Sequence, residues 1–249
     1  MPDLQTESQK IEIDQLNRKI RRNLKISRKI DNLIFIVMIL LLAYIGSTIY
    51  DNMNMTRYGD ELVKYHDFDE LKKQNPDICA WIKIDGTHID HPVVQGKDNF
   101  EYLDKDFNGD HYAGGTVFLD YENNPDFSDN YNVIHGHHMT GGAMFGDLVK
   151  YKKQEFFNKY KMGKLLTPKY DYKLKVVGVA KVNAYDDRIY NVKAMGKNVL
   201  TYASGISIHH RKAELKDGEK ILTLSTCSGD MNEDRIIVFC KMYGKQKHE

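Results

Sequence analysis

The chain has 249 residues and a formal net charge of +1, with 36 lysines and arginines against 35 aspartates and glutamates. This balance gives no case for a nucleic-acid partner, and a hydrophobic fraction of 41% is enough for a folded core. Three cysteines are too few for a disulfide scaffold, and because the number is odd, at least one thiol has no partner within the chain.

The N-terminal segment, residues 1–29, is a basic tail. Seven lysines and arginines, and no acid, lie between Arg18 and Lys29. Apolar residues at helical spacing predict a short amphipathic helix on an anionic inner leaflet. A partly ordered polar tail is the alternative interpretation, and the sequence leaves both open. The apolar residues concerned are Ile13, Leu16, Ile20 and Leu24.

An uncharged apolar stretch follows, 33-LIFIVMILLLAYIGSTIY-50. About 18 residues at 1.5 Å rise reach about 27 Å, close to the hydrocarbon thickness of a bilayer. We therefore predict a transmembrane anchor over 30–50. The positive-inside rule predicts a cytoplasmic N-terminus and an extracellular domain after Tyr50. A cleaved signal peptide is the alternative, but the stretch is long for one and no clear cleavage site follows it.

The outer portion begins with a spacer over 51–70. The pattern from 57 to about 75 is helical and ends at Asn75-Pro76, since a residue before proline avoids the helical region. The remainder, 71–249, is predicted to be one mainly β domain, a barrel or sandwich with inserted helices. The expected strands lie within 81–84, 89–94, 115–120, 131–135, 172–184, 221–226 and 235–242, and the expected helices at 98–105 and 142–160.

The stretch 221-ILTLSTCSGDMNEDRIIVFC-240 carries the first candidate chemistry. If its two apolar runs pair about a turn near Met231, Cys227 and Arg235 lie opposite each other, with Cβ atoms about 5 Å apart. A guanidinium there can stabilise a thiolate or a developing oxyanion. Alone, Cys227 is more typical of an inert buried thiol and Arg235 of a solvated strand residue. Their pairing favours the chemical interpretation.

A cysteine nucleophile also needs a base, usually histidine. The candidate is His137, which follows Gly136 at the end of a β run in 130-NYNVIHGHHMTGGAMF-145. The competing interpretation is a zinc site made from His135, His137 and His138, although no second cluster with ligand spacing accompanies them. A surface turn without a function is a further alternative.

These residues resemble the sortases, the cysteine transpeptidases of Gram-positive cell surfaces, and class B in particular. 223-TLSTC-227 is similar to the TLxTC signature, and Gly136-His137 and Arg235 match the histidine and arginine of the family. The resemblance implies that Cys227 is the nucleophile, His137 the acid and base, and Arg235 the stabiliser of the thiolate or oxyanion. Longer similar stretches are 80-AWIKIDGTHIDHPVVQGKDNFEYLDKDFNG-109, 115-GTVFLDYEN-123 and 137-HHMTGGAMFGDL-148.

The resemblance also implies a groove for a sorting signal. Two departures border it: His135 stands where the class often has tyrosine, and Ser228 where some members carry an acid. The preferred sorting signal is therefore harder to predict than the chemistry. The substrate-binding residues implied are Asn99, Leu103, His135, Ser225 and Thr226.

The fold implied is a closed sortase-type β-barrel of about eight strands, with N-terminal helices, a helix inserted at about 185–219 and one transmembrane helix before it. The activity implied is a membrane-anchored transpeptidase of the thiol peptidase class. It cleaves a C-terminal sorting signal of secreted proteins through a Cys thioester and transfers them to a peptidoglycan amine, without a metal or organic cofactor. The alternatives are a surface thiol protease that only hydrolyses and a non-catalytic metal-binding surface module.

The other two cysteines are expected in the core. Cys240 shares a strand face with Val238 and Met242, and Cys79 precedes Ala80-Trp81. A disulfide between Cys79 and Cys240 is compatible with an extracellular domain, but the sequence does not establish it.

Overall fold

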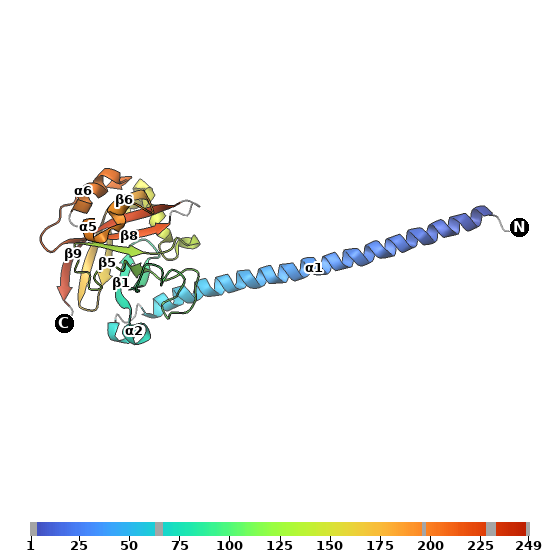
Figure 1. Ribbon diagram of the computed structural model, residues 1–249, viewed down its shortest axis with the longest axis horizontal. Helices are drawn as coiled ribbons and strands as arrows, with labels where there is room; N and C mark the ends of the chain where they lie inside the picture. The colour runs from blue at the N-terminus through green and yellow to red at the C-terminus, as the bar shows by residue number, and fades with distance from the viewer. Residues whose placement is uncertain (1–3, 63–66, 196–197, 228–232, 248–249) are drawn as a thin grey trace. The chain divides into compact units, whose positions relative to one another are not determined.

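The computed structural model describes residues 4–62, 67–195, 198–227 and 233–247, and the chain divides into two compact units, Met1–Lys64 and Tyr65–Glu249 (Figure 1). Helix α1 (Leu4–Leu62) makes up the first unit. It holds one candidate membrane span within Gln15–Gly46, with a mean hydropathy of 2.0. The basic residues before the apolar stretch continue the same helix, which favours the helical interpretation of that segment over a polar tail.

The second unit is built on one sheet. Its strands, among the described residues, run in the order β5-β1-β2-β3-β4-β8-β9-β6-β7, and a further pairing of β5 with β6 closes eight of them into a ring. The predicted closed β-barrel is confirmed, and β7 lies outside the ring on β6. The strands are β1 (Ile78–Ile84), β2 (Asp90–Val94), β3 (Phe118–Leu119), β4 (Tyr131–His135), β5 (Met162–Leu166), β6 (Tyr170–Asn183), β7 (His209–His210), β8 (Lys220–Cys227) and β9 (Asp234–Lys247).

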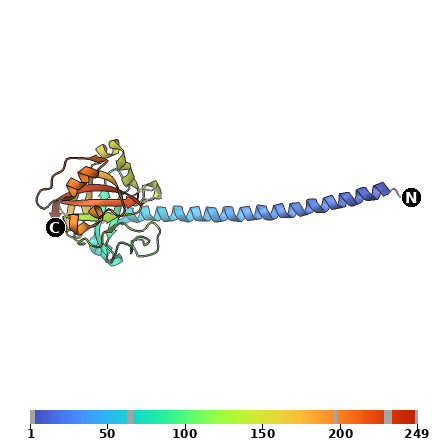
Figure 2. The ribbon, with the colours of Figure 1, turned by 45° about the horizontal axis from the view of Figure 1, so that its top comes forward.

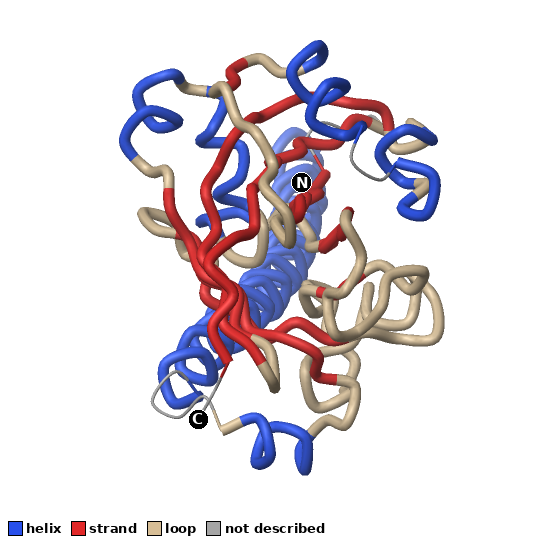
Figure 3. Tube along the Cα trace, turned by 90° about the vertical axis from the view of Figure 1, so that its left-hand side faces the viewer, coloured by secondary structure: helices blue, strands red, loops and turns tan. Residues whose placement is uncertain are grey.

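Short helices lie around the barrel (Figure 3). The first, α2, begins where the Asp67 carboxylate accepts hydrogen bonds from two backbone N–H groups, and it ends at Asn75, as predicted. The α-helices are α2 (Phe68–Gln74), α3 (Gln154–Lys159), α4 (Asp187–Tyr190), α5 (Val192–Met195) and α6 (Val199–Ile206). The 3-10 helices are η1 (Thr140–Gly142) and η2 (Gly146–Lys152).

Strands β8 and β9 lie side by side (Figures 1 and 2), and their central residues are buried on both faces. On the inner face, Leu222 and Val238 fill the barrel. On the outer face, Ile221, Ile237 and Phe239 pack under the connection that carries α4, α5 and α6. Burying each such side chain contributes about 1.5–3 kcal/mol. The connection therefore covers the middle of this outer face and leaves the end near Cys227 for a site.

Among its described residues, the inserted segment forms the three short helices α4, α5 and α6 instead of the one expected at 185–219. Asp and Asn side chains start new helices within the segment. The Asp186 carboxylate accepts a hydrogen bond from the N–H of Arg188, and the Asn191 amide oxygen accepts one from the N–H of Ala194. Such bonds favour helix starts over helix continuation. The insertion is helical as predicted, but divided.

The helix expected at 98–105 is absent, and that prediction was wrong. Asp98 starts one capped turn, with its carboxylate accepting from the N–H groups of Phe100 and Glu101. The turn does not propagate because the next carbonyls bond elsewhere: Tyr102 O accepts from Thr116 N, and Leu103 O accepts from His137. Strand β5 was not predicted, and the helix expected at 142–160 is divided into η2 and α3.

Candidate active site

The hairpin of β8 and β9 brings the predicted pair together. Its antiparallel register places Cys227 directly across from Arg235, as the sequence predicts. Opposite residues of an antiparallel pair have side chains on the same face, about 5 Å apart at Cβ. The side chain of Cys227 and the predicted turn at 228–232 lie outside the described part of the structure.

A second strand pairing, that of β4 with β8, brings His137 to the same end of β8 as Cys227. Strand β4 runs parallel to β8 and pairs His135 with Ser225, and Gly136 N then bonds to Ser225 O at 3.1 Å. His137 lies two residues after His135, just as Cys227 lies two residues after Ser225, so both reach the same end of the paired strands. Gly136 is required here, since a Cβ at this position would lie 2.8 Å from the ring of Phe145.

The His137 ring is held by a backbone carbonyl. Its Nε2 lies 2.7 Å from Leu103 O, an atom that only accepts hydrogen bonds, so Nε2 carries a hydrogen. Leu103 thus supports the histidine through its backbone as well as lining the groove. Arg235 is half-buried on the opposite strand, where its Nη1 donates to Asp234 O at 3.2 Å.

One cleft of about 710 Å³ gathers these groups. His137 and Arg235 line it with all five residues predicted for the substrate groove. The structure therefore brings together every predicted site residue whose side chain it describes. The five are Asn99, Leu103, His135, Ser225 and Thr226.

Asp120 organises the floor of this cleft and was not predicted. Its buried carboxylate accepts from Asn99 Nδ2 at 2.8 Å and lies 3.0 Å from His135 Nε2. Burial acts to raise the pKa of Asp120, but the hydrogen bond and charge of His135, with the N–H of Glu122 and the Asn99 amide, hold that pKa below its ordinary value. The sequence does contain a signal for this role, since Asp120 directly follows a strand. An aspartate there can accept a hydrogen bond from the backbone N–H two residues later, here that of Glu122.

His135 is packed as an aromatic residue. Its ring stacks on Phe118 at 5.1 Å and on Tyr190 at 5.9 Å between centroids. The Tyr190 hydroxyl is 2.9 Å from Ser225 Oγ, which ties α4 to the hairpin. The imidazole therefore lies between two aromatic rings, with its Nε2 edge facing the Asp120 carboxylate.

The remaining candidates for metal or disulfide chemistry are dispersed. The rings of His135 and His137 bond to different partners, and no group of three or more metal-ligating side chains was found among the described residues. Cys79 and Cys240 are buried and free. Burial raises the pKa of both thiols, that of Cys240 to about 12. Neither is a thiolate at neutral pH.

Comparison with known proteins agrees with this geometry. The sortase domain family model matches residues 82–243. The chain is 32% identical over 183 residues to sortase B of Staphylococcus aureus, covering 70% of this chain and 74% of that protein. Among solved structures, it is similar to a Streptococcus pyogenes class B sortase involved in pilus biogenesis (36% identity, TM-score 0.66, 72% of this chain and 98% of the other). It is also similar to Clostridium perfringens sortase B (34% identity, TM-score 0.64, 72% and 100%).

Proposed function

The chain belongs to the sortase family and to its class B, and on that premise we propose that it is a membrane-anchored transpeptidase in which Cys227, His137 and Arg235 carry out the chemistry. Members of this class are cysteine transpeptidases that anchor proteins to the cell wall. The substrate proposed is a secreted protein with a C-terminal sorting signal, and the acceptor is an amine of peptidoglycan.

The first step forms a thioester. The Cys227 thiolate attacks the carbonyl after the threonine of the sorting signal, and Arg235 stabilises the oxyanion. The carbon–nitrogen bond breaks as His137 gives its proton to the departing amine. A guanidinium suits this role because it donates in a planar fork and stays charged at any working pH.

The second step releases the product. The acceptor amine attacks the thioester, the carbon–sulfur bond breaks, and sulfur leaves as a thiolate. His137 takes the proton that the amine loses, because one histidine serves as acid in the first step and base in the second. Water in place of the amine gives plain hydrolysis. No step needs a metal or an organic cofactor.

The observation that carries the proposal is the pairing of β8 with a strand on each side, β9 and β4. One neighbouring strand pairs Cys227 with Arg235, and the other leads from Ser225's partner to His137. Both described side chains, His137 and Arg235, line one cleft open to solvent. An inert buried cysteine does not require this arrangement.

The test uses the full chain in detergent micelles. We expect one of a panel of sorting peptides to be cleaved after threonine and, with an amine present, to give a ligated product identified by mass. Cys227→Ala should abolish both reactions. Retained turnover in Cys227→Ala would refute the assignment, and hydrolysis that no amine diverts would favour the thiol protease instead.

A further inference from the structure

Exposed aromatic side chains gather at the mouth of the cleft. Among the described residues of the second unit, the exposed large hydrophobic side chains are Phe100 (74% exposed), Tyr121 (50%), Tyr185 (73%) and Ile208 (47%). All except Ile208 line the cleft. A single exposed apolar residue is ordinary, but three around one opening indicate a binding partner.

Carboxylates lie among these rings. Glu122, Asp187 and Glu233 line the same cleft, and Arg235 is the one lysine or arginine among the described residues that line it. The chain as a whole is balanced, with a net charge of +1, so this local excess of acid does not follow from composition. Asp120 also lines the cleft, but its carboxylate is engaged by His135 and Asn99. Among the described residues, no lysine or arginine forms a salt bridge with the first three.

The rings and carboxylates come from two walls, and in each wall a hydrogen bond donated by a backbone N–H joins two segments. In the first, Tyr121 N donates to Asn99 Oδ1 at 3.0 Å, which joins the loop of Phe100 to the turn of Tyr121 and Glu122. In the second, Ala184 N donates to Glu233 O at 2.7 Å, which joins the segment of Tyr185 and Asp187 to the start of β9. Each wall therefore presents an aromatic ring and a carboxylate. We call these six side chains the rim: Phe100, Tyr121, Glu122, Tyr185, Asp187 and Glu233.

Aromatic faces together with carboxylates attract an ammonium group. The ring quadrupole binds a cation, and carboxylates lining a cleft raise the local concentration of cations. Thr226 also lines the cleft, but it is 2% exposed and its Oγ1 is buried, so the binding of a cation rests on the rings and carboxylates of the rim.

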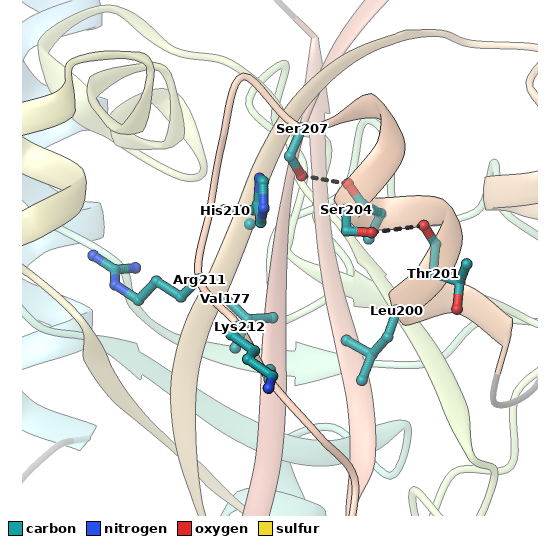
Figure 4. A pocket seen from close by; sticks show the side chains of 11 residues that line it. Val177, Leu200, Thr201, Ser204, Ser207, His210, Arg211 and Lys212 are labelled. Atoms are coloured by element: carbon teal, nitrogen blue, oxygen red, sulfur yellow. Dashed lines mark hydrogen bonds between the residues drawn. The ribbon is translucent and has the colours of Figure 1, made fainter.

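Two other cavities of this unit differ from the catalytic cleft. One, of about 590 Å³, is lined by two glutamates and a tyrosine but also by four lysines, and a lysine pairs with each glutamate. The other, of about 470 Å³, lies between α6 and residues 210–213 (Figure 4), and no carboxylate is among the described residues that line it. Arg211 points away from it and donates to Val176 O at 2.9 Å. The hydroxyls of Ser204 and Ser207 donate to carbonyls of their own segment. Nothing there matches the aromatic and acidic character of the rim.

We propose that the rim binds the acceptor amine of the transpeptidation in its ammonium form and delivers it to the thioester, an inference that rests on the proposed function. The ammonium loses one proton to water as it leaves the rim. The neutral amine then forms the carbon–nitrogen bond, sulfur departs as thiolate, and the second proton passes to His137. Rim residues act as specificity determinants for the acceptor, since they attract amines and offer nothing to an anion.

The test measures ligation to triglycine amide, a cationic acceptor, by the full chain in micelles with a sorting peptide that it cleaves. The triple variant Glu122→Gln, Asp187→Asn, Glu233→Gln and the double variant Phe100→Ala, Tyr185→Ala should each raise the KM for triglycine amide about tenfold, more than they raise the KM for the peptide. Salt should raise the amine KM of the wild type and have little effect on the triple variant. Glu155→Gln and Ile208→Ala, outside the cleft, serve as matched controls and should change neither KM.

An amine KM that is unaffected by both rim variants would overturn the proposal. So would a rise confined to sorting peptides that carry lysine, because the rim would then read the sorting signal. If the wild type ligates no peptide at all, the proposed function fails separately from the rim. In that case the rim is tested by binding alone. Binding of triglycine amide to the Cys227→Ala variant is followed by the broadening of the amine's NMR signals. Loss of this broadening when the rim carboxylates are removed would support the proposal, and its persistence would refute it.

Discussion

Arg235 has a position in the strand that fixes what it can do. It lies across from Cys227 and is half-buried beside the cleft, with one nitrogen bonded to a backbone carbonyl. The other guanidinium nitrogens lie in the same plane and can serve an oxyanion at the same time. A lysine offers a single point of charge and cannot make both contacts.

Arg235→Lys should therefore lower kcat/KM for sorting-peptide cleavage about 10²–10³-fold, the usual loss when one oxyanion donor is removed. Arg188→Lys is the matched control, since Arg188 is exposed on α4 and does not line the cleft. Steady-state kinetics with both variants, together with their thermal unfolding, separates a chemical effect from a folding effect. Activity equal to wild type in Arg235→Lys would remove this residue from the mechanism.

The three thiols should differ in reactivity. Burial raises the pKa of Cys240 to about 12 and raises that of Cys79, so each stays a protonated thiol in the folded protein up to strongly alkaline pH. The thiolate is the form that reacts. At pH 7, a maleimide should thus label one site per chain, with the label at Cys227 by peptide mapping.

Labelling of the folded Cys227→Ala variant would contradict this prediction, because it would show that a second thiol is accessible. Unfolding in denaturant provides the positive control, since Cys79 and Cys240 should then react in the same variant.

At the scale of elements, Asp120 joins three segments: the end of β3, the end of β4 and the loop of Asn99. Asp120→Asn should cost about 2 kcal/mol of unfolding free energy at pH 7, because a buried carboxylate bonded to several donors is lost. Asp110→Asn, at an exposed position, is the control and should cost little.

The cost should depend on pH. The pKa of Asp120 is lower in the folded protein than its unfolded value of about 3.9. Its contribution is therefore complete above pH 4–5 and declines as pH falls through the unfolded value toward the folded one. Unfolding followed at pH 7 and near pH 3 should show the gap between wild type and Asp120→Asn narrowing in acid. An equal difference in unfolding free energy at both pH values would mean that the charge of the Asp120 carboxylate is not what stabilises this part of the cleft.

The same elements show what could be read from the sequence. The pairing of Cys227 with Arg235 was predictable because a short hairpin with alternating side chains allows few registers. The position of His137 beside Cys227 could not be predicted from spacing, because it depends on β4 pairing in parallel with β8, which a long connection separates from it in sequence. The absent helix at 98–105 has the same origin. Its carbonyls bond to residues 116 and 137, which no local pattern reveals.

At the scale of the whole molecule, charge and hydropathy predict the orientation. The basic residues 18–29 precede the apolar stretch, and the cleft belongs to the unit that follows it. The positive-inside rule then predicts a cytoplasmic N-terminus and a Cys227 on the outer side of the membrane. This arrangement would let the enzyme meet secreted proteins and peptidoglycan amines on the same side of the membrane.

A thiol reagent that cannot cross membranes tests the orientation. In intact spheroplasts it should label Cys227 of the wild type, because a reactive thiol outside the bilayer is accessible to it. A Ser8→Cys, Cys227→Ala chain should be labelled only after lysis, since the tail is then expected to be cytoplasmic. Labelling of Ser8→Cys in intact spheroplasts, with Cys227 protected, would reverse the topology. A mature mass lacking the residues before Asp51 would instead identify the apolar stretch as a cleaved signal peptide, because an uncleaved anchor keeps its N-terminus.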